Sequence, residues 1–302
     1  MKNKYRVYWL FLLTISWLRL PVSCTQLDVE QVGASLKISA GSGLIVGKKR
    51  WASCTVGWNT AGTFTPEQTQ TIEAAMSEIN KIKVYFTLTK NNTPHIKVAF
   101  ASPEQVGKNN TEGVLTYRKP ALASIEGNVS RGYTIYLNQA HTWTTTQLKA
   151  VVMNQLGEIM GLPISTNEKS IMYPWLNPTT HTVQWSQEDV QELKQLYPES
   201  GLPAVKAGPP TLAPANKTHT IEINITNFDN IPPISNLGVC WSSTNPTPTI
   251  DNTEGRNAYG SDSKSLLISL WELKSGTRYY LRGYASNACG IQYSEVVVFS
   301  KQ

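Results

Sequence analysis

The chain has 302 residues, of which 40% are hydrophobic and only 16% are charged, so it is long enough for two packed domains of ordinary size. The formal net charge is +6, but four of the 27 basic residues and none of the 21 acidic ones lie in the first 24 positions, which leaves +2 for the rest. So small a charge excludes a nucleic-acid interface built on a strongly basic surface, and we expect no nucleic-acid partner.

The N-terminus has the layout of an export signal. Three basic residues precede an apolar run, Val7 to Leu18, which is shorter than the roughly 20 residues that cross a bilayer. The next segment ends with the small Ser23 before Cys24, as in a bacterial lipobox, although Pro21 departs from the usual pattern. We expect residues 1–24 to be a signal peptide and Cys24 to be lipidated. That lipid would hold the protein in the bacterial cell envelope, at the outer membrane. Secretion after ordinary cleavage is the alternative.

Residues 25–50 have the composition of an irregular leader, and a globular pattern begins near Trp51. Three helices are expected from 51 to 198, because each has a start or stop signal. The first begins at Thr65-Pro66 with Gln68 closing a capping box, the second runs from about 144–146 to Gly161, and the third from Ser186, paired with Asp189, to Tyr197. Strands are expected at 83–89, 95–100 and 134–137.

The second half of the chain has a different pattern. Residues 199–214 contain five Gly and Pro residues between 201 and 210, which indicates a linker. Residues 215–302 alternate with strand period, as in Ile221, Ile223 and Ile225, and short strands between turns favour a β-sandwich.

Three cysteines remain after residue 24: Cys54, Cys240 and Cys289. An odd count leaves at least one thiol without an internal partner. Cys240 and Cys289 lie in one expected domain and could pair, although two buried free thiols are the simpler expectation.

The most informative stretch runs from Leu148 to Pro198. It reads LKAVVMNQLGEIMGLPIS, then SIMYP, then WSQEDVQELKQLYP. This resembles the matrixin branch of the metzincin zinc proteases, in which a helix carries H-E-x-x-H-x-x-G-x-x-H, a Met-turn follows and a last helix closes the domain. The resemblance covers residues 51–198 and implies an α+β fold, a mixed sheet with a long active-site-type helix.

The scaffold positions of that motif are kept and its chemical positions are replaced. Gly161 and Met172 match the family's glycine and Met-turn methionine. The family's first histidine, glutamate base, second histidine and third histidine fall on Asn154, Gln155, Glu158 and Ile164.

These replacements remove both parts of the family's chemistry. A catalytic zinc takes three protein ligands, and of the aligned residues only Glu158 offers a good one. Gln155 has no basic lone pair and cannot take a proton from water. We therefore expect no zinc, no other cofactor and no metallopeptidase activity. The alternative is an active metallopeptidase with an unconventional metal site, in which His141 or His181 joins Glu158.

Tryptophans could supply a binding platform near positions 154–175, where a matrixin cleft lies. The candidates are Trp51, Trp58, Trp143, Trp175 and Trp185. Tryptophan is more often part of a core, so we weigh both interpretations.

Residues 215–302 resemble the fibronectin type III modules of bacterial surface proteins, from about residue 208 on. The resemblance rests on LGVCWS at 237–242 and LKSGTRYYLRGYA at 273–285. It implies a tyrosine-corner role for Tyr279 and a core position for Trp241.

Together these features predict an exported surface lipoprotein with an inactive matrixin-like domain and a fibronectin-like module. Its partner would be a peptide, a protein or a glycan, bound in the former protease cleft or on the second domain. The sequence does not name that ligand.

Overall fold

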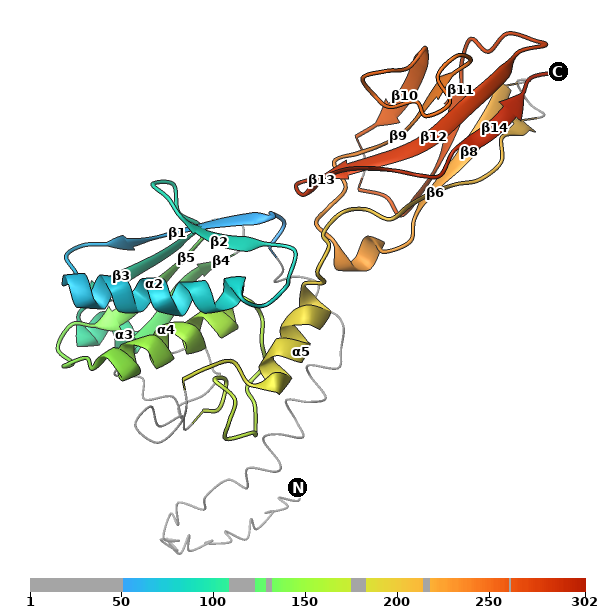
Figure 1. Ribbon diagram of the computed structural model, residues 1–302. Coiled ribbons are helices and arrows are strands. Elements are labelled where there is room, and N and C mark those ends of the chain that lie inside the picture. Colours follow the sequence, from blue (N-terminus) through green and yellow to red (C-terminus); the bar gives the residue numbers. More distant parts are fainter. Residues whose placement is uncertain (1–50, 109–122, 129–131, 175–182, 214–217, 261) are drawn as a thin grey trace, which may run out of the picture.

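The computed structural model contains a sheet-and-helix domain followed by an all-β domain (Figure 1). It describes residues 51–108, 123–128, 132–174, 183–213, 218–260 and 262–302. No helix within these ranges is both long and apolar enough to cross a membrane. Cys24 and the leader lie outside the described residues.

A five-stranded mixed sheet forms one layer of the first domain. Its order is β2-β1-β3-β5-β4. The strands are β1 (Thr55–Ala61), β2 (Thr87–Lys90), β3 (Ile96–Ala101), β4 (Ala123–Asn128) and β5 (Gly132–Asn138). β1 runs parallel to β2 and β3, and β3 runs parallel to β5, whereas β4 pairs antiparallel with β5 and forms an edge. The predicted mixed sheet is confirmed. β1 and β4 were not predicted, and β2 begins four residues later than expected.

Two long helices cover one face of this sheet (Figure 1), and two shorter ones complete the domain. They are α2 (Pro66–Asn80), α3 (Pro103–Lys108), α4 (Thr145–Ile159) and α5 (Gln187–Leu196). α2, α4 and α5 each begin with a capping box, so the N-terminal amides lacking intrahelical partners are satisfied locally. The predicted helix starts are confirmed for this reason.

The core of this domain lies between the sheet and the helices. Its fully buried side chains include Ile72, Met76, Ile79, Val98, Ile135, Leu137, Leu148, Val152 and Leu156. Three of the proposed platform tryptophans belong to the same core. Trp51, Trp58 and Trp185 are only 3%, 4% and 9% exposed, so the platform prediction is wrong for them because their rings fill the interior.

The second domain consists of two sheets that enclose a separate core. One has the order β10-β9-β12-β13, with β14 also on β12, and the other has the order β11-β8-β6, with β7 also on β8. The strands are β6 (Val205–Ala207), β7 (Thr211–Ala213), β8 (Thr218–Ile225), β9 (Asn236–Ser242), β10 (Gly255–Tyr259), β11 (Ser265–Leu270), β12 (Arg278–Asn287), β13 (Gly290–Tyr293) and β14 (Val297–Ser300). A short 3-10 helix, η1 (Phe228–Asn230), follows β8.

The predicted linker at 199–214 requires correction. Its residues form β6 and β7, which pair with β8 and so belong to the second domain. The prolines there do not prevent strand formation, because both strands are only three residues long and Pro209 and Pro210 lie between them.

The prediction about the cysteines also requires correction. Cys54, at the start of the first domain, pairs with Cys289, between β12 and β13, across a Cα–Cα distance of 5.2 Å. The side chain of Asn287 supports this junction by donating to the carbonyl of Gly201 at 2.7 Å. Cys240 is a buried free thiol. Burial raises its pKa to about 11, which keeps it protonated and unreactive at neutral pH.

Candidate functional site

The candidate site is built from the C-terminal half of α4 and the turn around Met172. Gly157 lies on the buried side of α4, and a Cβ atom there would collide with Sδ of Met172. The glycine therefore lets the methionine turn pack directly under the helix. Gly161 ends the helix with a φ of +87°, a conformation that favours glycine, and its amide donates to the carbonyl of Glu158 at 2.9 Å.

A buried carboxylate fixes the methionine turn to α5. Asp189 is 1% exposed and accepts hydrogen bonds from the hydroxyl of Ser170, from the amide of Ile171 at 3.0 Å and from the amide of Ser186 at 2.9 Å. Residue 189 thus serves both as the capping partner of α5 and as the anchor of the turn. On the other side of the turn, the amide of Ser165 donates to the carbonyl of Met172 at 3.2 Å.

Two amide side chains occupy the positions where a zinc ligand and the general base would be expected. Asn154 donates from Nδ2 to the carbonyl of Ile171 at 2.8 Å, and Gln155 donates from Nε2 to Oδ1 of Asn154 at 3.2 Å. Asn154 is half-buried and Gln155 is 6% exposed. The first of these hydrogen bonds joins α4 to the methionine turn, and the second links two neighbouring side chains of α4.

Glu158 and Ile164, the two other aligned positions, are both half-buried. Within the described ranges, no three His, Cys, Asp or Glu side chains gather into a group that could hold a metal. The donor set does not fit a catalytic zinc, because Ile164 has no ligand atom and neutral amides bind zinc poorly.

His141 does not approach Glu158. Its Nε2 lies 3.4 Å from Oε1 of Gln147, in the first turn of α4. Gln147 and Glu158 are eleven residues apart on one helix, which corresponds to about 16 Å along its axis. The proposed pairing of His141 with Glu158 is therefore wrong. The other candidate, His181, and Trp175 lie outside the described residues.

The outer edge of β4 lies next to this site and could bind an extended peptide. β4 is an edge strand, and α4 lies in contact with both β4 and β5. An edge strand presents a row of backbone donors and acceptors to an extended peptide.

Some elements of the site were not found from the sequence. The Ser186–Asp189 pair was recognised as a helix cap, but its second role in holding Ser170 and Ile171 was missed. The hydrogen bond from Asn154 to Ile171 was also missed. In the sequence, the SIMYP segment (170–174) follows closely after the matrixin-like helix. This closeness was a signal from which both contacts could have been predicted.

In comparison with known proteins, residues 50–198 match the family model described as Matrixin. Matrix metalloproteinase-18 of Xenopus laevis is 27% identical over 164 residues, which covers 49% of this chain and 33% of that protein. Metalloendoproteinase 1-MMP of Arabidopsis thaliana is 27% identical over 116 residues, or 35% of this chain and 30% of that protein. The chain thus spans about a third of the length of these curated relatives.

Solved structures that resemble the chain include one titled "Structure of Myroilysin", which has 13% sequence identity and a TM-score of 0.37 and covers 52% of this chain and 86% of that one. A hatching-enzyme zinc protease of Oryzias latipes (medaka) has 11% identity and a TM-score of 0.28, with 51% and 94% covered.

Proposed function

Because residues 50–198 match the Matrixin family model, we propose that this protein has kept a metallopeptidase fold as a binding module and does not hydrolyse peptides. The observation that carries the proposal is the pair of amides at Asn154 and Gln155. They stand where a zinc ligand and a base are needed, and they are hydrogen-bonded to each other and to the carbonyl of Ile171.

The ligand that we propose is an extended peptide segment of another protein. It would add as a further strand along the edge of β4 that pairs with no other described strand, beside α4. Backbone pairing of this kind requires neither a metal nor a base, so the loss of the catalytic residues would leave it intact. A glycan bound at the same place is the competing ligand class.

We further propose that the second domain is a fibronectin type III-like module and that the protein is exported and anchored through a lipid on Cys24. In support, the hydroxyl of Tyr279 accepts from the amide of Lys274 at 3.0 Å, as a tyrosine-corner residue does, and Trp241 is 5% exposed. The Cys54–Cys289 bond favours an oxidising compartment outside the cytoplasm.

The test of inactivity measures zinc content and peptide hydrolysis together. The purified exported chain is dialysed against trace zinc and assayed by elemental analysis and with a pool of quenched fluorescent peptides. We expect less than one tenth of a zinc ion per chain and no cleavage. The matched control is the fourfold variant Asn154→His, Gln155→Glu, Glu158→His and Ile164→His, which restores the family's residues and should gain one zinc per chain.

One tightly held zinc in the unmodified chain, together with cleavage that disappears in Glu158→Ala, would establish the alternative of an active enzyme with an unconventional metal site. Peptide binding is tested separately, by a library screen on the unmodified chain. A charged Lys or a Pro substituted into β4 should abolish binding without changing zinc content.

A further inference from the structure

The two domains are joined at two points, the polypeptide that follows α5 and the disulfide between Cys54 and Cys289. Cys54 immediately precedes β1 of the first domain, and Cys289 lies in the turn between β12 and β13 of the second. In Figure 1 this end of the second domain faces the first. A second attachment removes most of the rotation that a single peptide connection allows, so the bond restricts how the domains can be oriented.

The peptide connection is short, because both of its ends are fixed. Tyr197 is fully buried in the core of the first domain. From Gly201 on, the chain is tied to the second domain, since Asn287 donates to the carbonyl of Gly201 at 2.7 Å and Asn227 donates to that of the next residue at 2.9 Å. Residues 198–200 remain between these fixed points, and we identify them as the hinge.

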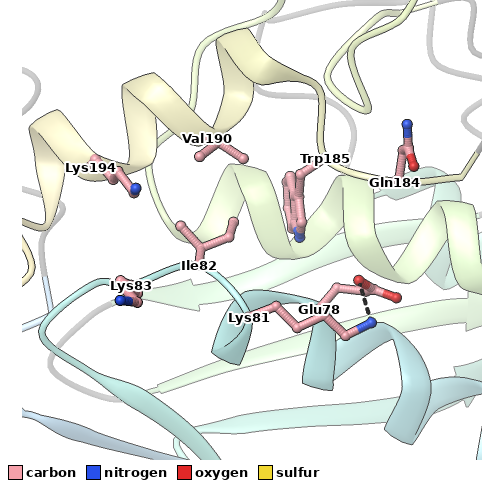
Figure 2. Close-up of a pocket in the computed structure, with 8 residues that line it drawn as sticks. All are labelled: Glu78, Lys81, Ile82, Lys83, Gln184, Trp185, Val190 and Lys194. Atoms are coloured by element: carbon pink, nitrogen blue, oxygen red, sulfur yellow. Dashed lines mark hydrogen bonds and ion pairs between the residues drawn. The ribbon is translucent and has the colours of Figure 1, made fainter.

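Few other contacts hold the domains together. Each domain has a core of its own, and Cys289 is the one hydrophobic residue of the described second domain that packs against the first core. No ion pair within the described ranges links the two domains. The pocket in Figure 2 is lined by residues of the first domain alone and does not extend into the junction.

The packing at the junction is close but small. A Cβ atom added to Gly201 would collide with Sγ of Cys289 and would lie 3.0 Å from Cγ of Tyr85, so the glycine is held between the disulfide and this ring. Domains that share so small an interface are expected to move relative to each other unless something else restrains them. The disulfide is therefore the main restraint on their arrangement.

We propose that the Cys54–Cys289 bond is a redox-sensitive latch that sets the orientation of the second domain relative to the first. Both cysteines are half-buried, so a small thiol can reach them. A dithiol reductant opens the latch: its two sulfurs form a disulfide with each other and give up two protons and two electrons, which convert the two cysteines to thiols. The open latch lets the domains turn independently about residues 198–200.

The test compares the oxidised and the reduced exported chain, with both domains present. Backbone amide relaxation, measured by NMR, gives a rotational correlation time for each domain. We expect one shared correlation time in the oxidised chain. After dithiothreitol we expect both domains to stay folded, because each has its own core, while their correlation times separate and fall by about a third. Peptide mass spectrometry establishes that the bond is present before reduction and absent afterwards.

Variants separate the latch from other effects of the reductant. Cys54→Ser combined with Cys289→Ser should give separate correlation times without any reductant. The matched control is Cys240→Ser, which removes the buried free thiol and should tumble as the unmodified chain does in both redox states. The reduced chain decides the question if the double serine variant fails to fold, because it keeps every residue of the sequence.

Three results would overturn the proposal. One is a shared correlation time for both domains after the bond has been reduced. Another is loss of the dispersed amide resonances of the first domain on reduction, because the bond would then hold the fold and not the arrangement. The third is a purified, oxidised chain in which peptide mass spectrometry finds Cys54 and Cys289 unlinked. The inference does not depend on whether the first domain binds peptides.

Discussion

Gly157 and Asn154 lie one turn apart on α4, but only Asn154 falls on a chemical position of the matrixin pattern. Gly157 makes room for Met172, the methionine of the Met-turn, and Gly161 retains the family's helix ending. Asn154 stands in the place of a histidine and donates to the carbonyl of Ile171. The comparison teaches that packing positions and chemical positions on one helix can change independently, because Gly157 is held by close contact with Met172 whereas Asn154 makes a hydrogen bond.

The largest expected effect is at Asp189, which holds the methionine turn in place and is therefore grouped with the packing positions. Asp189→Ala leaves the hydroxyl of Ser170 and the amides of Ile171 and Ser186 without their acceptor in a buried place. We expect the free energy of unfolding to fall by about 3 kcal/mol in urea denaturation. Asp229→Asn, at a carboxylate that is 78% exposed, is the control and should change stability by less than about 0.5 kcal/mol.

The second prediction concerns Gly157 itself. Gly157→Ala places a methyl group against Sδ of Met172, and the overpacking should cost about 2 kcal/mol, partly offset by the better helix propensity of alanine. Gly107→Ala, in α3, has open space around the new Cβ and should leave stability unchanged or raise it slightly. Equal effects of the two substitutions in urea denaturation would show that contact with Met172 is not the reason for the glycine.

A smaller effect is expected at the chemical position. Asn154→Ala removes the hydrogen bond to Ile171 and the acceptor used by Gln155, and it should cost about 1.5 kcal/mol, since a net intramolecular hydrogen bond contributes about 0.5–1.5 kcal/mol. Gln191→Ala, at an exposed position on α5, is the control for the change to alanine. If Asn154→Ala lowered the free energy of unfolding as much as Asp189→Ala does, the distinction between packing positions and chemical positions would be contradicted.

The smallest expected effect is the pH dependence at Glu78, on α2. Burial tends to raise the pKa of Glu78, but hydrogen bonds from Lys149 and Lys81 outweigh it and hold the pKa below the ordinary 4.5. A lowered folded-state pKa means that this stabilisation is complete above about pH 4.5 and is lost as the pH falls through the folded-state value.

The measurement for Glu78 is urea denaturation at pH 6 and pH 3. Glu78→Gln should reduce stability by less than about 1 kcal/mol at pH 6 and have a smaller effect at pH 3. Glu73→Gln is the control, because the Glu73 side chain is 46% exposed whereas that of Glu78 is 16% exposed. A larger effect of Glu78→Gln at pH 3 than at pH 6 would reverse the sign of this linkage.

The sequence alone predicted the parts of the fold that depend on local signals. The capping residues Thr65 and Ser186 mark two helix starts because a side-chain oxygen satisfies backbone amides a few residues away. The motif around Gly161 and Met172 predicted the matrixin-like fold because its spacing reflects a helix that must end before the Met-turn.

Tertiary structure decided what depends on residues far apart in the chain. The pairing of Cys54 with Cys289 spans 235 positions, and Asp189 reaches Ser170 across 19. Neither contact has a local pattern, because each arises only when separate elements are brought together. The same reason explains why 199–214 resembled a linker: β6 and β7 are too short to give a periodic signal, and only pairing with β8 makes them strands.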